Sequence, residues 1–385
     1  MKKKLLVTAS TFPRWEGDTE PRFVLDLSKA LSEYFDVTVL VPGCPGAKEE
    51  EVLDGVKVIR YHYFPIHQWE TLCYPGAIVP RIKEKKVRIL LVPFLFLGLW
   101  WKLFRILKNY DVVHAHWIIP QGIVQSFFKK DYIVTGHGGD VLELNAGILR
   151  IFKRRVLTKA KAVTVVSNRL KNKIQEMYHI NNVYVQSMGC DFSKFSTQKR
   201  IENYFNQQNK KVILFVGRFV KIKGIEYLIE AMGDIDAKLV VVGKGPLEEE
   251  LKRKAKKFED KILFMEAQGH ETLSKVYASS DIFVIPSITL EGGVTEGTPT
   301  VISEAMASGL PVIGTKTGGI PEVIQNGKNG FLIEEQSSKA ISEKINLILK
   351  NQDLYQKLQE GALKTADKYD YTVVAKNFYK ILGGN

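Results

Sequence analysis

Short apolar runs rich in β-branched residues alternate with longer amphipathic stretches in the first half of the chain. The apolar runs lie at residues 4–9, 37–41, 56–61, 112–116, 132–135, 162–166 and 183–186, and helical periodicity is found at 22–34, 95–108, 148–158 and 169–178. Strands that are apolar along their whole length are typical of a parallel sheet covered by helices on both faces. The pattern therefore predicts a first domain built on such a sheet.

The same alternation starts again after residues 196–208, which are polar and show no periodicity. Predicted strands follow at 211–216, 238–242, 262–265, 282–285, 311–314 and 330–333, and helices at 224–232, 247–257, 271–278, 300–307, 320–325 and 338–350. A chain of 385 residues exceeds what one core usually supports. We therefore expect two doubly wound α/β domains, with ligands at the carboxyl ends of the strands. The expected boundaries are 1–195 for the first domain, 196–208 for a linker, 209–367 for the second domain and 368–385 for a C-terminal segment packed back on the first.

One segment of the second half, residues 296–311 (EGTPTVISEAMASGLP), joins a tight turn to the start of a predicted helix. Pro299 suits the first position of a helix. The backbone N–H groups of Thr300, Val301 and Ile302 then point out of the helix N-terminus, where they form an anion site suited to a phosphate.

Two glutamates frame this turn. Glu304 lies on the predicted helix, where its carboxylate can accept hydrogen bonds from the neighbouring hydroxyls of a ribose. Glu296 precedes the turn and can face a sugar hydroxyl on the other side of the phosphate. The alternative is an ordinary capped helix with surface glutamates, but the coincidence of turn, helix and both acids favours a binding site.

A second segment, residues 216–224 (VGRFVKIKG), follows a predicted strand and precedes a helix. Arg218 and Lys223 at the carboxyl end of a parallel strand can clamp a diphosphate, and Arg218 can bind it bidentately. Lys221 is interpreted as solvated. Such a basic loop is weak evidence alone, but it gains weight beside the first segment.

These two segments resemble those of retaining glycosyltransferases of the GT-B fold, family 4 (glycosyltransferase group 1). The similarity includes the glutamate pair, the helix that follows it and the segments 217–224, 242–246 and 281–287, so it extends over nearly the whole second half. The resemblance implies a transfer of a sugar from a nucleoside-diphosphate sugar to an acceptor hydroxyl, with retained configuration and without a metal or other cofactor.

The resemblance also implies roles for individual residues. Arg218 and Lys223 would hold the donor diphosphate together with the amides of Thr300 and Val301. Glu304 would bind the ribose and Glu296 the transferred sugar.

In the first half the similarity is thinner. Gly17 lies in the loop after the first strand and would bring backbone to the diphosphate, although a Gly-Asp pair stands where the family often has two glycines. His137 would face the donor sugar, and Asp140 is a further candidate on the acceptor side. The loop at 288–295 is longer than usual for the family and is expected to influence acceptor or donor choice.

Two rival functions remain open from the sequence. An inverting transferase or sugar-nucleotide epimerase needs a carboxylate or histidine base, for which His137 and Asp140 are the evident candidates. A binding protein for sugar nucleotides or anionic lipids would show no turnover.

Three patterns imitate other sites. Asp234 and Asp236 imitate a metal-binding Asp-x-Asp motif but lie at the amino end of a predicted strand. The glycine pair at 243–245 lacks the third glycine of a dinucleotide fingerprint. His114 and His116 have no third zinc ligand nearby in the sequence and are interpreted as a strand end.

Charge distinguishes the two halves. Residues 1–200 carry 31 Lys and Arg against 18 Asp and Glu, whereas residues 201–385 carry 24 of each, so the whole net charge of +13 lies in the first half. A one-sided basic surface favours an anionic partner. Three widely separated cysteines predict no disulfide framework and fit a reducing cytosol.

Much of this charge lies in residues 81–108, which hold eight cations, the single acid Glu84 and a run of aromatic and aliphatic residues that includes Trp100 and Trp101. This composition suits a helix in the headgroup zone of an anionic membrane, although a buried helix with a basic flank is an alternative. The apolar run 89–101 has 13 residues, short of the ~20 that a membrane-spanning helix needs. We expect a protein bound peripherally to the cytoplasmic face of the cell membrane, with a lipid-linked or saccharide acceptor and no nucleic-acid partner.

Overall fold

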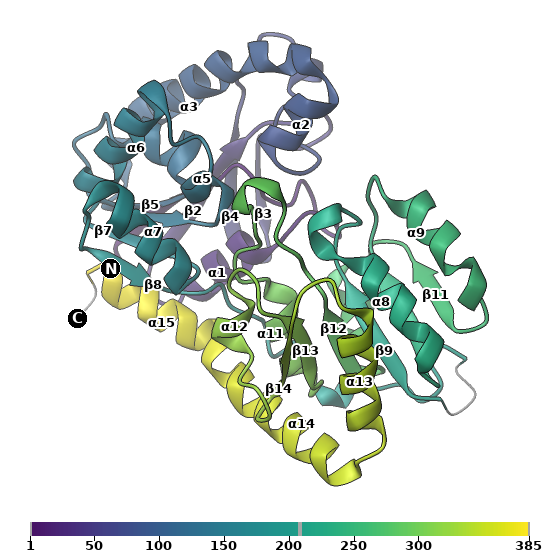
Figure 1. Ribbon diagram of the computed structural model, residues 1–385. Coiled ribbons are helices and arrows are strands. Elements are labelled where there is room, and N and C mark those ends of the chain that lie inside the picture. Colours follow the sequence, from purple (N-terminus) through teal and green to yellow (C-terminus); the bar gives the residue numbers. More distant parts are fainter. Residues whose placement is uncertain (1, 207–209, 384–385) are drawn as a thin grey trace. The chain divides into compact units, whose positions relative to one another are not determined.

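The structure is a computed structural model that describes residues 2–206 and 210–383 (Figure 1). The chain divides into two compact units: unit 1 comprises Met1–Met188 and Val374–Asn385, and unit 2 comprises Gly189–Val373. Each unit has its own sheet, and helices connect successive parallel strands. The prediction of doubly wound α/β architecture is confirmed for both units.

Unit 1 contains an eight-stranded sheet in the order β3-β4-β2-β1-β5-β6-β7-β8. Its strands are β1 (Lys4–Thr8), β2 (Asp36–Pro42), β3 (Glu50–Leu53), β4 (Val56–Tyr61), β5 (Val112–His116), β6 (Tyr132–Gly136), β7 (Ala162–Val165) and β8 (Val183–Val185). Its helices are α1 (Phe23–Leu31), α2 (Ile78–Glu84), α3 (Val92–Ile106), α4 (Ile123–Gln125), α5 (Gly139–Leu142), α6 (Gly147–Lys159) and α7 (Asn168–Tyr178).

Unit 2 contains a six-stranded, all-parallel sheet in the order β11-β10-β9-β12-β13-β14. Its strands are β9 (Val212–Val216), β10 (Lys238–Val242), β11 (Ile262–Met265), β12 (Ile282–Ile285), β13 (Val312–Thr315) and β14 (Gly330–Ile333). Its helices are α8 (Ile225–Ala231), α9 (Glu248–Ala255), α10 (His270–Ala278), α11 (Thr300–Ala307), α12 (Ile320–Val323), α13 (Ser338–Leu349) and α14 (Gln352–Ala366). Counted within the unit, the order is the 3-2-1-4-5-6 arrangement of nucleotide-binding sheets.

The central strand of unit 2 shows why its sequence is apolar throughout. Val212, Leu214 and Val216 of β9 pack into one core cluster, whereas Ile213 and Phe215 pack into a second. Successive side chains of a strand point to opposite faces, so both faces of the sheet are covered. Helices α10, α11 and α12 supply one cluster, and α8, α9 and α13 supply the other.

One strand of unit 1 was missed by the sequence analysis. β3 (Glu50–Leu53) pairs antiparallel with β4 (Val56–Tyr61), so the sheet of unit 1 is not wholly parallel. The strand is too polar to show in a search for apolar runs. Its signal is the turn at Asp54 and Gly55, whose φ angles of 47° and 82° are those of a type I′ hairpin.

The polar segment predicted as a linker, 196–208, packs on unit 2 as far as it is described. The Arg200 guanidinium lies 3.1 Å from the Asp281 carboxylate, and Phe205 is buried in a core cluster of unit 2. Residues 207–209, which include the predicted end of the linker and start of the second domain, lie outside the described residues. The segment up to residue 206 belongs to unit 2.

Within the described residues, one helical segment is long and apolar enough to cross a membrane, judged by length and composition alone. It extends over Lys86–Asn109, 24 residues with a mean hydropathy of 1.8 in its most apolar window. The apolar run 89–101 is shorter than this helical segment, because the segment continues beyond the run at both ends. Its central part is α3, which packs Leu95, Leu99 and Leu103 into unit 1, yet only 17% of the apolar window is buried.

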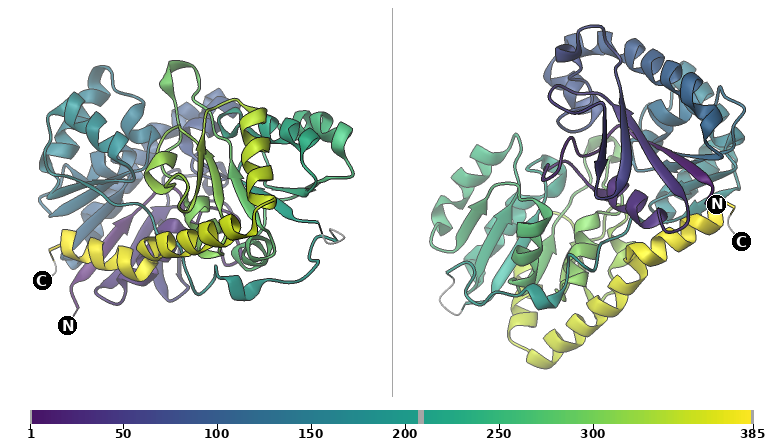
Figure 2. Two further views of the ribbon diagram at one scale, coloured as in Figure 1. Left: turned by 60° about the horizontal axis from the view of Figure 1, so that its bottom comes forward. Right: turned by 180° about the vertical axis from the view of Figure 1, so that it is seen from behind.

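Helix α15 (Tyr371–Ile381) completes unit 1 from the far end of the sequence. In the two views of Figure 2, the yellow end of this helix lies near the start of the chain. Phe378 is fully buried, with its ring 5.0 Å from that of His114 on β5. Of the predicted C-terminal segment 368–385, residues 374–385 therefore fall in unit 1 and the preceding ones in unit 2.

Candidate functional site

The carboxyl ends of β9 and β12 carry the candidate residues of the second half. These two strands are neighbours in the sheet. β9 is the first strand of unit 2, and β10 lies on one side of it while β12 lies on the other. Doubly wound sheets bind ligands outside the strand ends at such a switch in strand order. The fold therefore brings the two segments identified in the sequence to one place.

Lys223 and Glu296 form an ion pair at this place. The Nζ of Lys223 lies 2.6 Å from Oε1 of Glu296, and the two side chains keep only 14% and 12% of their surface exposed. The hydroxyl of Ser287 donates to Oε2 of Glu296 at 3.0 Å. Lys223 was predicted to bind the diphosphate and Glu296 the transferred sugar, and in the structure the two side chains bind each other. A phosphate or sugar hydroxyl that binds here competes for charges already held in position.

The turn before α8 is fixed against the end of β12. Gly224 has a φ of +59°, and a Cβ there would lie 2.1 Å from the carbonyl oxygen of Pro286. The N–H of Ile288 donates to the carbonyl oxygen of Ile222 at 2.8 Å. Only glycine permits this close approach. The backbone contact places Lys223 beside Glu296.

Arg218 has a different environment from Lys223. Its side chain is exposed, and among the described residues its guanidinium has no hydrogen-bond or ion-pair partner. The loop around it is held by the backbone of residues 242–244, because the N–H of Gly217 donates to Val242 and that of Phe219 donates to Lys244. The glycine pair at 243–245 thus supports the Arg218 loop. A planar guanidinium on a fixed loop is suited to bidentate binding of phosphate.

Helix α11 starts at the predicted place with a different cap. Pro299 is the N-cap residue and Thr300 is the first residue of the helix, so the prediction that Pro299 occupies the first helical position was wrong. The N–H of Ile302 donates to the carbonyl oxygen of Pro299 at 3.2 Å, so this amide does not point free as predicted. The amides of Thr300 and Val301 remain as the N-terminal donors for an anion.

Glu304 is buried on α11, and its position depends on a residue that the sequence analysis did not identify. The hydroxyl of Tyr277 on α10 donates to Oε2 of Glu304 at 2.9 Å. Burial raises the pKa of Tyr277 well above its usual value, so the hydroxyl stays protonated and continues to donate. Tyr277 lies on the inward face of an amphipathic helix, where a tyrosine resembles any core residue. Only the tertiary contact shows its function.

The loop at 288–295 is tied to the β14 side of unit 2. The backbone N–H and the hydroxyl of Thr289 donate to the Glu335 carboxylate at 2.5 and 2.7 Å. The hydroxyls of Thr289 and Thr317 lie 2.9 Å apart. The loop therefore has a conformation defined by these hydrogen bonds.

Gly17, His137 and Asp140 belong to unit 1. Gly17 has a φ of +78° in the loop after β1. Next to it, Asp18 binds Arg14 through two side-chain hydrogen bonds of 2.9 and 2.8 Å. Burial alone would raise the pKa of Asp18, but the hydrogen bonds from Arg14 outweigh it and lower this pKa. Asp18 therefore links the two ends of the segment 14–18 within this loop.

His137 follows β6 and contacts other imidazoles. Its Nε2 lies 3.0 Å from Nδ1 of His116, whose ring is tilted by 31° against that of His114 with centroids 4.1 Å apart. Burial lowers the pKa of both His114 and His137 to about 3. These rings are therefore neutral at physiological pH and donate or accept hydrogen bonds without carrying charge. The interpretation of His114 and His116 as a strand end is confirmed by β5.

Asp140 organises the backbone around His137. Its Oδ1 accepts hydrogen bonds from the N–H groups of His137 and Gly138 at 2.9 and 3.0 Å, and its Oδ2 accepts from Ile118 at 2.9 Å. Desolvation nevertheless raises its pKa. This arrangement gives Asp140 a positioning task in the turn that presents His137.

The aspartates at 234 and 236 lie where the sequence places them, at the amino end of β10 (Lys238–Val242). Asp236 pairs with Lys210 at 2.9 Å, and both side chains are well exposed. They lie at the opposite end of the strands from Arg218 and Lys223. The metal-binding interpretation of this pair gains no support from its position.

Comparison with known proteins agrees with this geometry. The family model described as glycosyl transferases group 1 matches residues 196–365, and the model described as glycosyltransferase family 4 matches residues 21–194. A sequence relative, N-acetyl-alpha-D-glucosaminyl L-malate synthase of Bacillus anthracis, is 28% identical over 325 residues, 79% of this chain and 78% of that protein.

Solved structures are similar over the whole chain. Sucrose-phosphate synthase of Thermosynechococcus elongatus has a TM-score of 0.80 at 19% identity, over 99% of this chain and 98% of that one. Anabaena HepE in complex with UDP-glucose has a TM-score of 0.70 at 18% identity, over 99% of both chains. The fold is GT-B. Together with the matches that cover both halves and the cation–glutamate site at the β9–β12 switch, this shows that the chain is a glycosyltransferase of family 4, the group 1 glycosyltransferases.

Proposed function

We propose that this glycosyltransferase moves a sugar from a nucleoside-diphosphate sugar to an acceptor hydroxyl with retention of configuration and without a metal ion. Its expected place is cell-surface polysaccharide or glycolipid assembly. The observation that carries the proposal is the Lys223–Glu296 ion pair, held at 2.6 Å at the β9–β12 switch beside the N-terminus of α11. It combines a cation for the leaving diphosphate with a carboxylate for the transferred sugar.

The charge of the leaving group is the main energetic demand of this reaction. The glycosidic C–O bond breaks to give an oxocarbenium-like sugar and a departing diphosphate. Arg218, Lys223 and the amides of Thr300 and Val301 offer positive charge and N–H donors on one side of unit 2. Preorganised donors of this kind stabilise charge as it develops in the transition state, without reorganisation.

Retention follows if the acceptor attacks from the face that the diphosphate leaves. The new glycosidic bond forms as the old one breaks, and the leaving phosphate oxygen accepts the proton of the acceptor hydroxyl. The rival, inverting mechanism needs a separate base. Asp140 accepts three backbone N–H bonds, and Nε2 of the half-buried His137 lies 3.0 Å from Nδ1 of the buried His116, so neither has the environment of a free base.

The test is a turnover assay with a panel of nucleotide sugars. We expect release of nucleoside diphosphate only when an acceptor is present, a product with the anomeric configuration of the donor, and unchanged turnover after treatment with EDTA. Inversion of configuration would contradict the retaining assignment. Activity restored only by Mn²⁺ or Mg²⁺ would point back to Asp234 and Asp236. Nucleotide binding without turnover would favour the binding-protein alternative.

We also propose that unit 1 binds an anionic membrane at the cytoplasmic face. Helix α3 and the turns before it expose a row of large apolar side chains: Val87, Ile89, Leu90, Phe94, Leu97, Trp100, Trp101 and Phe104. Large apolar side chains exposed together are typical of an interaction site. We call this row of side chains the α3 surface.

The α3 surface extends towards a second helix, α6 (Gly147–Lys159), which was predicted as a helix but not as part of a membrane-binding surface. The ring of Trp100 lies 6.1 Å from that of Phe128, and Phe127 lies 6.1 Å from Phe152 on α6. Helix α6 exposes two isoleucines, Ile148 and Ile151, at 66% and 69%, next to the exposed Arg150 and Arg154. Apolar side chains beside cations on adjacent elements suit a headgroup zone.

The cations of the 81–108 region do not all serve this surface. Arg81 and Arg88 both bind Glu84, at 2.6 and 3.1 Å, and Arg88 is buried. Two of the eight cations in this region are therefore engaged in intramolecular ion pairs. The six others lie at positions 83, 85, 86, 102, 105 and 108.

A surface-bound helix fits these contacts better than a spanning one. Leu95, Leu99 and Leu103 pack into unit 1, so a helix that crossed the bilayer would have to leave that core. Lys102 and Arg105 interrupt the apolar sequence near the end of α3 (Val92–Ile106). An amphipathic helix that lies in the interface keeps both its packing and its charges.

We predict that binding to vesicles requires anionic lipid and weakens with salt. Replacing Leu97 and Trp101 together by glutamate should lower the affinity about tenfold or more, because burial of one large apolar side chain is worth about 1.5–3 kcal/mol. Leu347→Glu on α13 of unit 2 is the matched control, since Leu347 is also exposed, at 42%. Co-sedimentation with neutral and anionic liposomes is the measurement. Equal recovery in the supernatant with both lipids at low salt would refute the membrane proposal and leave the sugar-transfer proposal standing.

A further inference from the structure

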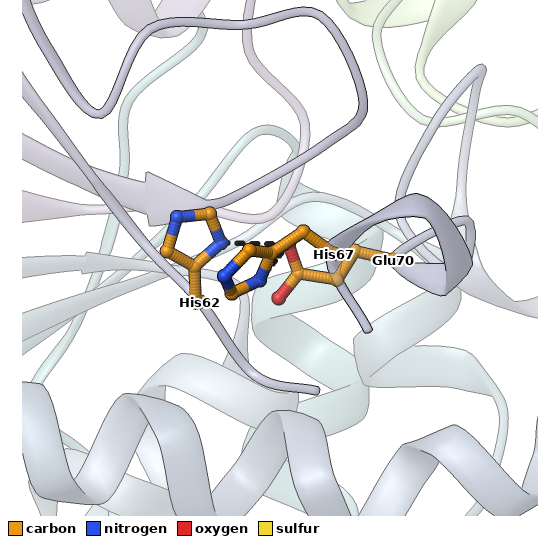
Figure 3. A group of neighbouring side chains, drawn as sticks. All are labelled: His62, His67 and Glu70. Atoms are coloured by element: carbon orange, nitrogen blue, oxygen red, sulfur yellow. Dashed lines mark hydrogen bonds and ion pairs between the residues drawn. The ribbon is translucent and has the colours of Figure 1, made fainter. Parts of the chain in front are cut away.

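Three side chains in the loop after β4 of unit 1 bring metal-ligand atoms together, and none of them belongs to the candidate donor site of unit 2. His62, His67 and Glu70 each offer one ligand atom, and these atoms all lie within 4.8 Å of one another. Figure 3 shows both imidazole rings beside the Glu70 carboxylate. Nδ1 of His62 lies 2.8 Å from Oε2 of Glu70, and Nδ1 of His67 lies 3.6 Å from the same oxygen.

Glu70 is the reason to expect a cation here. Its side chain has no exposed surface, and its ion-pair partners among the described residues are the two imidazoles. A buried carboxylate is normally paired with a full positive charge or coordinates a metal. The rings of His62 and His67 lie 3.5 Å apart, so two imidazolium ions would repel each other at this distance. One dication bound to two neutral imidazoles supplies the charge without that repulsion.

Neighbouring groups form hydrogen bonds with the candidate ligands, as the outer partners of ligands do in metal sites. The other oxygen of Glu70, Oε1, accepts the N–H groups of Tyr63 and Phe64 at 2.5 and 3.1 Å. The other ring nitrogen of His62, Nε2, lies 3.0 Å from a carboxylate oxygen of Glu49. A metal-bound histidine commonly donates its second N–H to a carboxylate, which fixes the orientation of the ring.

A glycine, with no side chain of its own, lies next to the ligand atoms. Gly43 borders them so closely that a Cβ there would lie 3.0 Å from Oε2 of Glu70 and 3.2 Å from Nδ1 of His62. Zinc bonds of about 2.0–2.1 Å in a tetrahedron separate two ligand atoms by about 3.3 Å. The observed separations of 2.8 and 3.6 Å lie on either side of that value. His67 is 56% exposed and can adjust, and it leaves an open side for a fourth ligand.

We propose that His62, His67 and Glu70 bind one divalent transition-metal ion, with Zn²⁺ as the best match. Two imidazoles and one carboxylate suit zinc, whereas Mg²⁺ and Ca²⁺ prefer oxygen ligands. This site is independent of the proposed sugar transfer and of its metal-free chemistry. Its function is structural: it ties the end of β4 to the short helix His67–Trp69.

The tied loop lies under the α3 surface. The ring of Phe64 packs edge-on against Phe94 at 5.0 Å. A Cβ at Gly98 of α3 would lie 2.9 Å from the Cα of Tyr63, so the helix rests directly on this loop. Metal binding should therefore stabilise the support of α3, which hydrogen exchange of residues 62–70 can follow.

The test is a zinc titration of untagged, chelator-treated full-length protein, by competition with a chromophoric chelator. We expect one Zn²⁺ per chain, and cobalt bound in its place should give the visible absorption of a four-coordinate ion. His67→Ala and Glu70→Gln should each lower the affinity by more than about a hundredfold. Glu49→Gln should lower it about tenfold, as outer partners of ligating histidines do.

His179→Asn is the control, because His179 is the exposed C-cap residue that follows α7 and its αL geometry suits asparagine. It should bind zinc as the wild type does. Circular dichroism confirms folding, and His67→Ala is the informative variant because its side chain is exposed. Absence of stoichiometric binding by the wild type, or equal affinity in His67→Ala, would overturn the proposal, whatever the transfer activity of either protein.

Discussion

Replacing Arg218 by alanine should reduce turnover by about a hundredfold or more, the scale of one lost contact to transition-state charge. The side chain is exposed and has no partner among the described residues, so folding should be unchanged. Steady-state kinetics with a nucleotide-sugar donor is the measurement. Arg218→Lys keeps the charge but loses the planar fork, so it should recover only part of the activity.

Lys221→Ala is the matched control for this loop, because Lys221 is exposed, three residues from Arg218. Its turnover should equal that of the wild type. Lys223→Ala should be as damaging as Arg218→Ala, but with a second effect. It leaves the largely buried Glu296 carboxylate without its cation, so the melting temperature should fall as well. Wild-type turnover in both Arg218→Ala and Lys223→Ala would rule out this diphosphate site.

The two glutamates should separate nucleotide binding from sugar transfer. Glu304→Ala should weaken binding of the nucleoside diphosphate itself, since ribose is part of that ligand. Glu296→Ala should leave nucleoside diphosphate binding intact and reduce turnover of the full donor by about a hundredfold, because a transition-state contact to the sugar is lost. Calorimetry with both ligands and a turnover assay measure the two effects.

Milder variants sharpen this comparison. Tyr277→Phe removes the hydroxyl that donates to Glu304, and Ser287→Ala removes the one that donates to Glu296. Each should reproduce a smaller form of the defect of its glutamate, because the carboxylate stays and only its positioning is lost. An equal loss of nucleotide affinity in Glu296→Ala and Glu304→Ala would contradict the assigned roles.

Much of the fold was predictable because its signals are local. Each strand predicted from a short apolar run is present within one or two residues, since a strand covered on both faces is made mostly of apolar side chains. β3 (Glu50–Leu53) escaped because an edge strand needs no apolar pattern. α14 (Gln352–Ala366) also escaped, although Asn351 caps it by accepting from the N–H of Leu354.

The site was predictable in its residue types and not in its contacts. The turn before α11 and the Arg218 loop are contiguous in sequence, so their chemistry could be inferred directly. The Lys223–Glu296 ion pair joins residues from two strand ends, and Tyr277 reaches Glu304 from another helix. Such contacts arise only when the sheet order is set. The cluster of His62, His67 and Glu70 is hidden for a related reason, because nothing in the sequence shows that Glu70 is buried.

Helix α15 has a consequence for biosynthesis. The ribosome delivers all of unit 2, Gly189–Val373, before the residues from Val374 onward that belong to unit 1. Until those residues emerge, His114 lacks the aromatic cover of Phe378, and the ring of Tyr34 lacks Tyr379, which stacks on it at 4.6 Å. Domains usually complete their folding in the order of translation, N-terminal first. Here the first unit cannot complete its fold before the second unit has been synthesised. Until translation has passed residue 378, the apolar helix α3 therefore belongs to an incompletely folded domain.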